Sequence, residues 1–175
     1  MGLEFAFQDS QRLYLIMEFV NGGELFYHLK QARVGFGEDR AKFYAAEMVL
    51  ALEYLHKMGV VYRDLKPENV LVDNEGHIRL TDFGLSKSGL KETNGRTESF
   101  CGTPEYLAPE IVRDRTYGYS VDWYSFGLVL YEMLTGINPF KTGQELSLVE
   151  KMNEILHKEI PIPKKLSIEA RDLLK

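Results

Sequence analysis

The sequence has few of the features that mark secreted, nucleic-acid-binding or exported proteins. Its single cysteine, Cys101, cannot form an internal disulfide, which excludes a disulfide scaffold and favours a reducing compartment. Basic residues are not in excess, because 21 Lys and Arg against 26 Asp and Glu give a net charge of −5. That balance argues against nucleic acid as the partner. The residues after Met1 contain no basic segment leading into an apolar one, so no signal peptide is predicted.

Long apolar runs are also missing. The most apolar stretch has nine uncharged residues between Asp122 and Glu132, whereas a membrane-spanning helix needs about 20. We therefore expect no membrane segment and a helix buried inside a protein core at this position. With 175 residues, 45% of them hydrophobic, composition alone predicts one soluble, cytoplasmic domain.

Hydrophobic periodicity predicts both strands and helices. Short apolar, partly β-branched runs are typical of buried strands, and apolar residues at three- and four-residue intervals are typical of helices with one buried face. We expect Ser120 and Ser167 to cap the helices that follow them, and Gly136 to end one. Strands are predicted at 3–7, 12–19, 70–72 and 77–80, and helices at 24–31, 38–58, 121–135, 146–158 and from 168 onward.

The densest polar cluster lies between the long helix and the predicted hairpin. Asp64, Lys66 and Asn69 precede the hairpin, and Asp82 follows it. Because a hairpin brings its two ends together, these four side chains are expected to converge. Two carboxylates, an amide and a lysine suit a hard divalent cation and a phosphate, with one carboxylate left to act as a base.

Two other interpretations of this cluster remain open. Each piece alone is typical of a polar turn with a surface Asp–Lys pair. Paired carboxylates also occur in glycosidases. Lys66 and Asn69, which are interleaved with the acids, favour phosphoryl transfer instead.

The chain resembles the eukaryotic protein kinases. The family signature is H-R-D-L-x-x-x-N, then D-F-G, then A-P-E, and Tyr62 in place of the histidine is characteristic of the AGC group of serine/threonine kinases. The resemblance extends from about residue 3 to residue 175. It rests on Y-R-D-L-K-P-E-N at 62–69, D-F-G at 82–84, F-C-G-T-P-E-Y-L-A-P-E at 100–110 and M-E-F-V-N-G-G-E at 17–24.

The resemblance implies an α+β, protein-kinase-like fold that is mainly the helical large lobe. Residues 1–20 would be a remnant of the antiparallel small-lobe sheet and the hinge. Residues 21–175 would be the large lobe with its catalytic and activation loops, incomplete at the C-terminus. The family's glycine-rich loop, its V-A-I-K lysine and the helix that pairs with that lysine are not found. The G-x-G at 35–37 precedes a helix in the wrong place to replace that loop.

The family's catalytic roles transfer to four positions. Asp64 would accept the proton of the substrate hydroxyl or orient that hydroxyl, and Lys66 would neutralise the phosphoryl group in flight. Asn69 and Asp82 would hold Mg²⁺, with ATP as the phosphoryl donor. Asp122 would brace the catalytic-loop backbone from the buried helix, because an unpaired buried acid would be costly.

The resemblance also implies a nucleotide site and a peptide site. Adenine, ribose and phosphates would contact Met17, Glu18, Val20, Glu24, Glu68, Asn69, Leu71, Thr81 and Asp82. Arginines just upstream of the target hydroxyl would meet Glu24, Glu68 and Glu132. Lys66 and Thr103 beside the catalytic aspartate indicate serine/threonine specificity. The expected partners are therefore protein substrates with basic residues near the target.

Regulation is predicted for the irregular stretch 84–105, since a long loop in a compact domain is usually functional or mobile. Arg63 beside the catalytic aspartate indicates control by a phosphate, which arginine binds in a bidentate manner. Ser99 occupies the family's usual phosphosite and Thr97 is the second choice. An upstream activating kinase is then implied.

Three hypotheses about the whole chain follow. The first is a piece of a working AGC serine/threonine kinase. The second is a non-catalytic fragment that binds kinase substrates or partners as a decoy, and the third is an unstable product without function. The intact set Asp64, Lys66, Asn69 and Asp82 favours the first, because a binding module does not need it.

Overall fold

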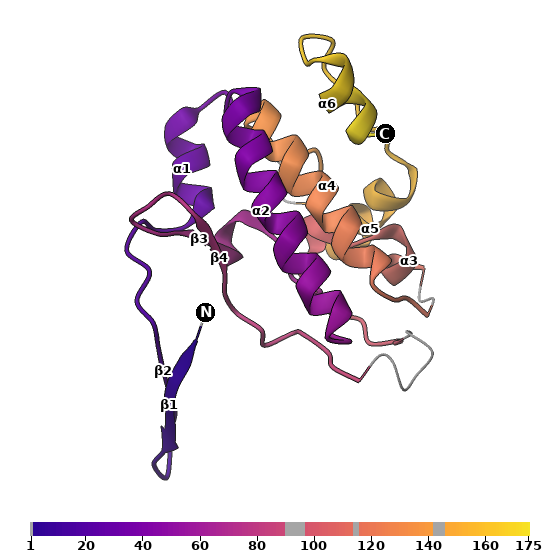
Figure 1. Cartoon of the computed structure of the whole chain (residues 1–175). Coiled ribbons are helices and arrows are strands. Elements are labelled where there is room, and N and C mark those ends of the chain that lie inside the picture. Colours follow the sequence, from indigo (N-terminus) through magenta and orange to yellow (C-terminus); the bar gives the residue numbers. More distant parts are fainter. Residues whose placement is uncertain (1, 90–96, 114–115, 142–145) are drawn as a thin grey trace.

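The computed structural model describes residues 2–89, 97–113, 116–141 and 146–175 (Figure 1). Two strands and two helices come first, a second pair of strands follows, and the rest of the described chain is helical. Short 3-10 turns lie at Pro67–Asn69 and Pro104–Tyr106. The combination of helices with two small antiparallel sheets confirms the α+β prediction.

The body is built on two long helices, α2 (Glu38–Lys57) and α4 (Ser120–Thr135), which lie side by side and run in opposite directions (Figure 1). His56, near the end of α2, hydrogen bonds to Asp122 in the first turn of α4. At the opposite end, the Phe36 N–H donates to the Met133 carbonyl at 2.6 Å. The face predicted for α2 is the buried one, with Ala41, Tyr44, Ala45, Met48 and Leu52 in the core.

Helix α4 is buried on nearly all sides, as its apolar sequence predicts. Eleven of its 16 residues are buried. Two of these are acids, Asp122 and Glu132, and buried acids need partners. The helix ends as predicted at Gly136, whose φ of 80° is in the left-handed region that glycine tolerates.

The hairpin of β3 (Val70–Val72) and β4 (Ile78–Leu80) forms as predicted. The Asp73 carboxylate closes its turn by accepting the N–H groups of Glu75 and His77, each at 3.0 Å. Pairing of Val70 with Leu80 brings the two chain ends together. The site residues on either side of the hairpin therefore become neighbours.

The prediction of a strand within residues 12–19 is confirmed, but the prediction that this strand is buried is wrong. Strand β2 is shorter, Leu13–Met17, and pairs with β1 (Leu3–Gln8) in a two-stranded hairpin that projects from the helical body (Figure 1). Leu13 is 77% exposed and Leu15 is 61% exposed. Among the described residues nothing packs as a second layer on this hairpin, so its apolar side chains stay in solvent.

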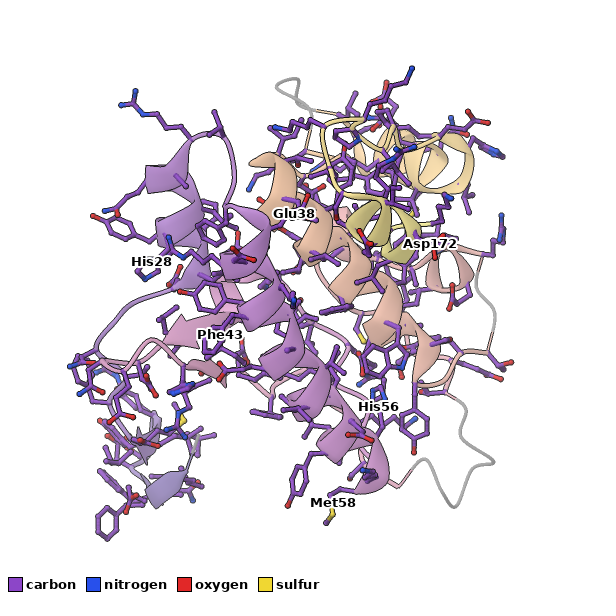
Figure 2. The ribbon with its side chains drawn as sticks, turned by 45° about the horizontal axis from the view of Figure 1, so that its top comes forward. His28, Glu38, Phe43, His56, Met58 and Asp172 are labelled. Atoms are coloured by element: carbon purple, nitrogen blue, oxygen red, sulfur yellow. The ribbon has the colours of Figure 1, made fainter. Side chains whose placement is uncertain are left out.

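The remaining helices are short: α1 (Leu25–Ala32), α3 (Pro109–Val112), α5 (Leu148–His157) and α6 (Ile168–Leu173). A capping box between Ser147 and Glu150 starts α5, and Ser167 caps α6 as predicted. The Ser167 N–H also donates to Glu38 at 2.8 Å, which ties α6 to the start of α2 (Figure 2).

The predicted cap at Ser120 is wrong. Tyr119 is the N-cap residue of α4, and Ser120 is the first helical residue. The Ser120 hydroxyl instead donates to the Glu110 carboxylate of α3 at 3.1 Å. It therefore does not cap α4. None of the helices in the described ranges is both long enough and apolar enough to cross a membrane.

Candidate active site

One buried carboxylate fixes the loop between α2 and β3. Asp122 is fully buried, and its two oxygens accept the Tyr62 N–H at 2.9 Å and the Arg63 N–H at 2.8 Å. Arg63 has a φ of 69°, a left-handed conformation that costs a non-glycine residue about 1–3 kcal/mol. The Asp122 contacts hold this strained backbone and confirm the predicted brace. They also fix the position of the next residue, Asp64.

Asp64 lies at the centre of a compact hydrogen-bonded cluster. It is 5% exposed, and its Oδ2 accepts Lys66 Nζ at 2.8 Å and Asn69 Nδ2 at 2.9 Å. Its Oδ1 accepts the Thr103 hydroxyl at 2.7 Å, and that hydroxyl also accepts Lys66 Nζ at 2.8 Å. Three of the four residues expected to converge, Asp64, Lys66 and Asn69, are thus in direct contact, and Thr103 joins them in place of Asp82. The donors from three side chains fix the orientation of the Asp64 carboxylate.

Asn69 and Asp82 are brought together by the hairpin. The Thr81 N–H donates to the Asn69 carbonyl at 3.0 Å, which places Asp82 one residue beyond that bond. The Asn69 amide nitrogen is used twice by Asp64, so its Oδ1 is the atom left for a ligand. Asp82 is exposed and uses Oδ1 to accept the Gly84 N–H at 3.1 Å.

The oxygen atoms of this pair match the chemistry of Mg²⁺. Magnesium is usually held by one or two carboxylates together with substrate phosphates and water, rather than by a cage of protein ligands. In the described ranges no group of three or more His, Cys, Asp or Glu side chains is placed to hold a metal. One amide oxygen and one carboxylate therefore fit Mg²⁺ bound together with a phosphate.

Tyr62 links the catalytic loop to the Asp82 segment. Its hydroxyl donates to the Thr81 carbonyl, and its ring packs edge-on against Phe83 with centroids 5.3 Å apart. Burial, together with the negative charges of Asp64 and Asp82, raises the pKa of Tyr62 far above its usual value. The phenol therefore stays neutral and acts as a hydrogen-bond donor that positions the residue before Asp82.

The residues predicted to bind the nucleotide are only partly brought together. Glu24 forms a β-bridge with Leu71, and the Val72 N–H donates to the Gly23 carbonyl at 2.8 Å, so the start of α1 lies against β3. Met17 and Glu18 lie on or beside the projecting hairpin and are exposed. Among the described residues no hydrogen bond or ion pair connects these two to the Asp64 cluster.

The predicted peptide-binding acids differ in burial. Glu24 is exposed, whereas Glu132 is 6% exposed and accepts the Tyr106 hydroxyl at 2.6 Å. Burial raises the pKa of Glu132, and the nearby charge of Glu68 adds to that effect, while Tyr106 and Lys141 oppose it. Glu68 Oε2 is buried and has no hydrogen-bond partner in the described ranges.

The two predicted phosphosites have different surroundings. Thr97 is 4% exposed, pairs with Tyr117 through two backbone hydrogen bonds and accepts Lys87 Nζ at 2.8 Å. Ser99 is exposed, and its carbonyl accepts the Tyr117 hydroxyl. Arg63 Nη1 donates to the same hydroxyl at 3.3 Å. The guanidinium is therefore close to the Ser99 backbone.

Sequence reasoning missed several residues of the site. Tyr106 and Tyr117 position Glu132 and Ser99, Lys87 contacts Thr97, and His56 Nε2 is 2.7 Å from Asp122 Oδ2. Figure 2 shows His56 near the end of α2. No periodicity marks these residues, because each partner lies far away in sequence. The acids inside an apolar helix, Asp122 and Glu132, were the available signal that partners had to exist.

The helical body, the loop braced by a buried carboxylate and the aspartate after a hairpin have the architecture of the large lobe of a protein kinase. The model of the protein kinase domain family matches residues 2–175. The chain therefore belongs to the protein kinase domain family, which confirms the resemblance and the predicted fold.

Curated relatives narrow the group. A RAC family serine/threonine-protein kinase homolog from Dictyostelium discoideum is 53% identical over 99% of this chain and 38% of that protein. Serine/threonine-protein kinase Sgk1 from Xenopus tropicalis is 52% identical over 99% of this chain and 40% of that protein. RAC-beta serine/threonine-protein kinase B from Xenopus laevis is 54% identical over 99% of this chain and 35% of that protein. These relatives agree with the AGC assignment, and the chain spans 35 to 40% of their length.

Proposed function

We propose that this chain carries the catalytic loop of a serine/threonine protein kinase, which transfers the γ-phosphoryl group of ATP to protein hydroxyls. The Asp64 cluster is the observation that carries the proposal. A buried carboxylate held by Lys66, Asn69 and Thr103 is oriented without any further ligand. Phosphoryl transfer requires such preorganisation, because the reaction depends on positioning and charge stabilisation.

Each residue of the cluster has a distinct task. Asp64 receives a hydrogen bond from the substrate hydroxyl and orients its oxygen for attack. Lys66 presents a positive charge beside that position, and the Thr103 hydroxyl bridges the two side chains.

Asn69 Oδ1 and the Asp82 carboxylate are the groups proposed to hold Mg²⁺ with ATP. When bound, the ion neutralises charge on the phosphate oxygens. Met17, Glu18 and Val20 would contact adenine, Glu24 would take the ribose, and Leu71 would lie beneath the base. Glu68 and Thr81 complete the proposed nucleotide site. Support comes from the contact between the Glu24 segment and β3.

Basic substrates are proposed because carboxylates gather near the loop. Glu68 Oε2 is buried without a partner in the described ranges, and its charge acts on the pKa of Glu132. A buried unsatisfied carboxylate oxygen is costly. An arginine side chain would supply the missing donors, since its guanidinium binds a carboxylate in a bidentate manner. Glu24 would bind a second basic residue.

Ser99 is proposed as the site of an activating phosphate, added by an upstream kinase. It is exposed, whereas Thr97 is buried. Arg63 donates to the Tyr117 hydroxyl, which in turn donates to the Ser99 carbonyl. Lys87 donates to the Thr97 hydroxyl, two residues before Ser99. Two cations that contact the neighbours of Ser99 fit a phosphate that carries about two negative charges. A cytoplasmic location is proposed on the lone cysteine, which suits a reducing compartment.

The test is phosphoryl transfer by the purified protein to a serine peptide with upstream arginines. Asp64→Asn should reduce kcat by about 100- to 10,000-fold, the usual contribution of a general base. Asp172→Asn, at an exposed position of α6 far from the loop, is the matched control and should retain activity. Transfer that is unchanged in Asp64→Asn would refute the proposal. Peptide binding without any transfer by the wild type would favour the decoy alternative.

A further inference from the structure

Two lysines contact one aromatic ring near Glu24, one of the carboxylates proposed to bind basic substrate residues. Phe26 and Lys30 lie one turn apart on α1, and Lys30 Nζ is 5.3 Å from the Phe26 ring centroid. Lys141, which follows α4, reaches the same ring from another part of the chain with Nζ 5.1 Å from its centroid. Both lysines are exposed. We call these three residues the Phe26 cluster.

The ring holds the two ammonium groups without neutralising them. A cation–π contact at an exposed site is weak and does not neutralise the cation, and both lysines remain exposed to solvent. Among the described residues neither Lys30 nor Lys141 has a carboxylate within ion-pair distance. Both ammonium groups are therefore kept beside one ring, 5.3 and 5.1 Å from its centroid, without a carboxylate partner in the described ranges.

The Phe26 cluster borders the carboxylates that are proposed to bind basic substrate residues. Glu24 immediately precedes α1, so it lies within one turn of Phe26. The charge of Lys141 acts on Glu132 and also on Glu105. The cluster therefore lies close to the carboxylates that are proposed to bind basic residues.

The charge available to a substrate changes from negative to positive at the Phe26 cluster. Glu105, whose pKa Lys141 also affects, already forms an ion pair with Lys151 at 2.5 Å. Burial acts to raise the pKa of Glu105, but the hydrogen bond and charge of Lys151, with Lys141, outweigh it and lower that pKa. A further basic residue of a substrate would therefore find Glu105 occupied and Lys30 and Lys141 repelling it.

We propose that the Phe26 cluster is an anion-binding subsite of the peptide face, which takes an acidic or phosphorylated side chain upstream of the basic residues of the substrate. This inference rests on the proposed function, because Asp64 and the acidic site define where the peptide lies. Lys30 and Lys141 would bind the anion from two sides, and Phe26 would limit their motion. The chain would then select substrates by a charge pattern, negative before positive.

The test measures binding of fluorescent peptides to the purified protein by anisotropy. All peptides contain the target serine and the upstream arginines, and they carry Asp, phosphoserine, Ala or Lys at successive positions further upstream. At one position the anionic peptides should bind about 3- to 10-fold tighter than the Ala peptide, as expected for ion pairs at an exposed site. The Lys peptide should bind more weakly there. If the Asp and phosphoserine peptides both bind more tightly than the Ala peptide, the subsite binds carboxylates as well as phosphates. If only the phosphoserine peptide binds more tightly, the subsite is specific for phosphate.

Two charge-reversal variants distinguish binding at the Phe26 cluster from a general effect of the protein's net charge. Lys30→Glu combined with Lys141→Glu should reverse the preference, so that the Lys peptide binds tighter than the Asp peptide. Lys164→Glu, an exposed lysine elsewhere, should leave the preference unchanged. Equal binding of the Asp, phosphoserine and Ala peptides at every position would overturn the inference, provided that removing the arginines still weakens binding. If removing the arginines has no effect, the proposed basic-substrate function fails first, and the inference fails with it.

Discussion

Asp122 offers a direct measure of how much the catalytic loop depends on one buried group. Asp122→Ala would leave the N–H groups of Tyr62 and Arg63 without acceptors, and each buried orphan costs about 1–3 kcal/mol. His56 would lose its partner as well. Removing one member of a buried ionic cluster costs about 3–5 kcal/mol. We expect a loss of about 3–5 kcal/mol in the free energy of unfolding.

Asp122→Asn tests the same contacts at constant volume. It keeps one acceptor oxygen but places an amide N–H₂ group opposite another N–H donor. We therefore expect about half to all of the alanine effect, about 1.5–5 kcal/mol. A small domain has only about 5–15 kcal/mol of stability in total. Both substitutions should consequently release the loop even where the helices remain folded.

Urea unfolding followed by far-UV circular dichroism gives the global free energy, and amide hydrogen exchange at Tyr62 and Arg63 reports the loop itself. Asp172→Asn is the matched control, because its side chain is 78% exposed and its contact with Lys175 is on the surface. The control should change the free energy of unfolding by less than about 0.5 kcal/mol. The brace is refuted if Asp122→Asn costs less than about 1 kcal/mol and the exchange of both amides is unchanged.

Three further changes test other parts of the chain. Gly35→Ala should destabilise the fold by about 1–3 kcal/mol in urea unfolding, because its φ is 87° and a Cβ would lie 2.8 Å from backbone atoms of α4 and Gly136. Gly127→Ala, inside α4 with open space around its Cβ, should instead stabilise by about 1 kcal/mol. Because burial raises the pKa of Glu132 above its ordinary 4.5, the affinity for arginine peptides in titrations should fall on acidification before the usual glutamate range. Glu132→Gln should remove that step, and a pH profile identical in both proteins would contradict the assignment.

The local parts of the fold could be predicted from the sequence because they depend on neighbours in the chain. The α2 face follows from the spacing of Ala41, Met48 and Leu52, which all lie in the core. The hairpin at 70–80 follows from its turn residues, and it places Asn69 beside Asp82. These two elements were enough to expect the convergence on Asp64.

What the sequence could not show was which side chains would find partners from distant segments. The apolar run of β2 is typical of a buried strand, yet Leu13 and Leu15 are exposed because burial depends on a second layer. Ser120 has the residue type of a cap, but Glu110 of α3 takes its hydroxyl. The Lys141 contact with Phe26 joins α1 to the segment after α4 and has no sequence signal at all.

Helix α4 illustrates how the number of donors decides what a buried acid does. Asp122 and Glu132 lie in the same helix and are almost equally buried. Asp122 receives two backbone N–H groups and His56, so its carboxylate is fully used in holding the loop. Glu132 receives the Tyr106 hydroxyl but faces the negative charge of Glu68, and its pKa is raised. A carboxylate left short of positive charge gains most when a cation arrives, which is why the first acid is a brace and the second is proposed as a binding group.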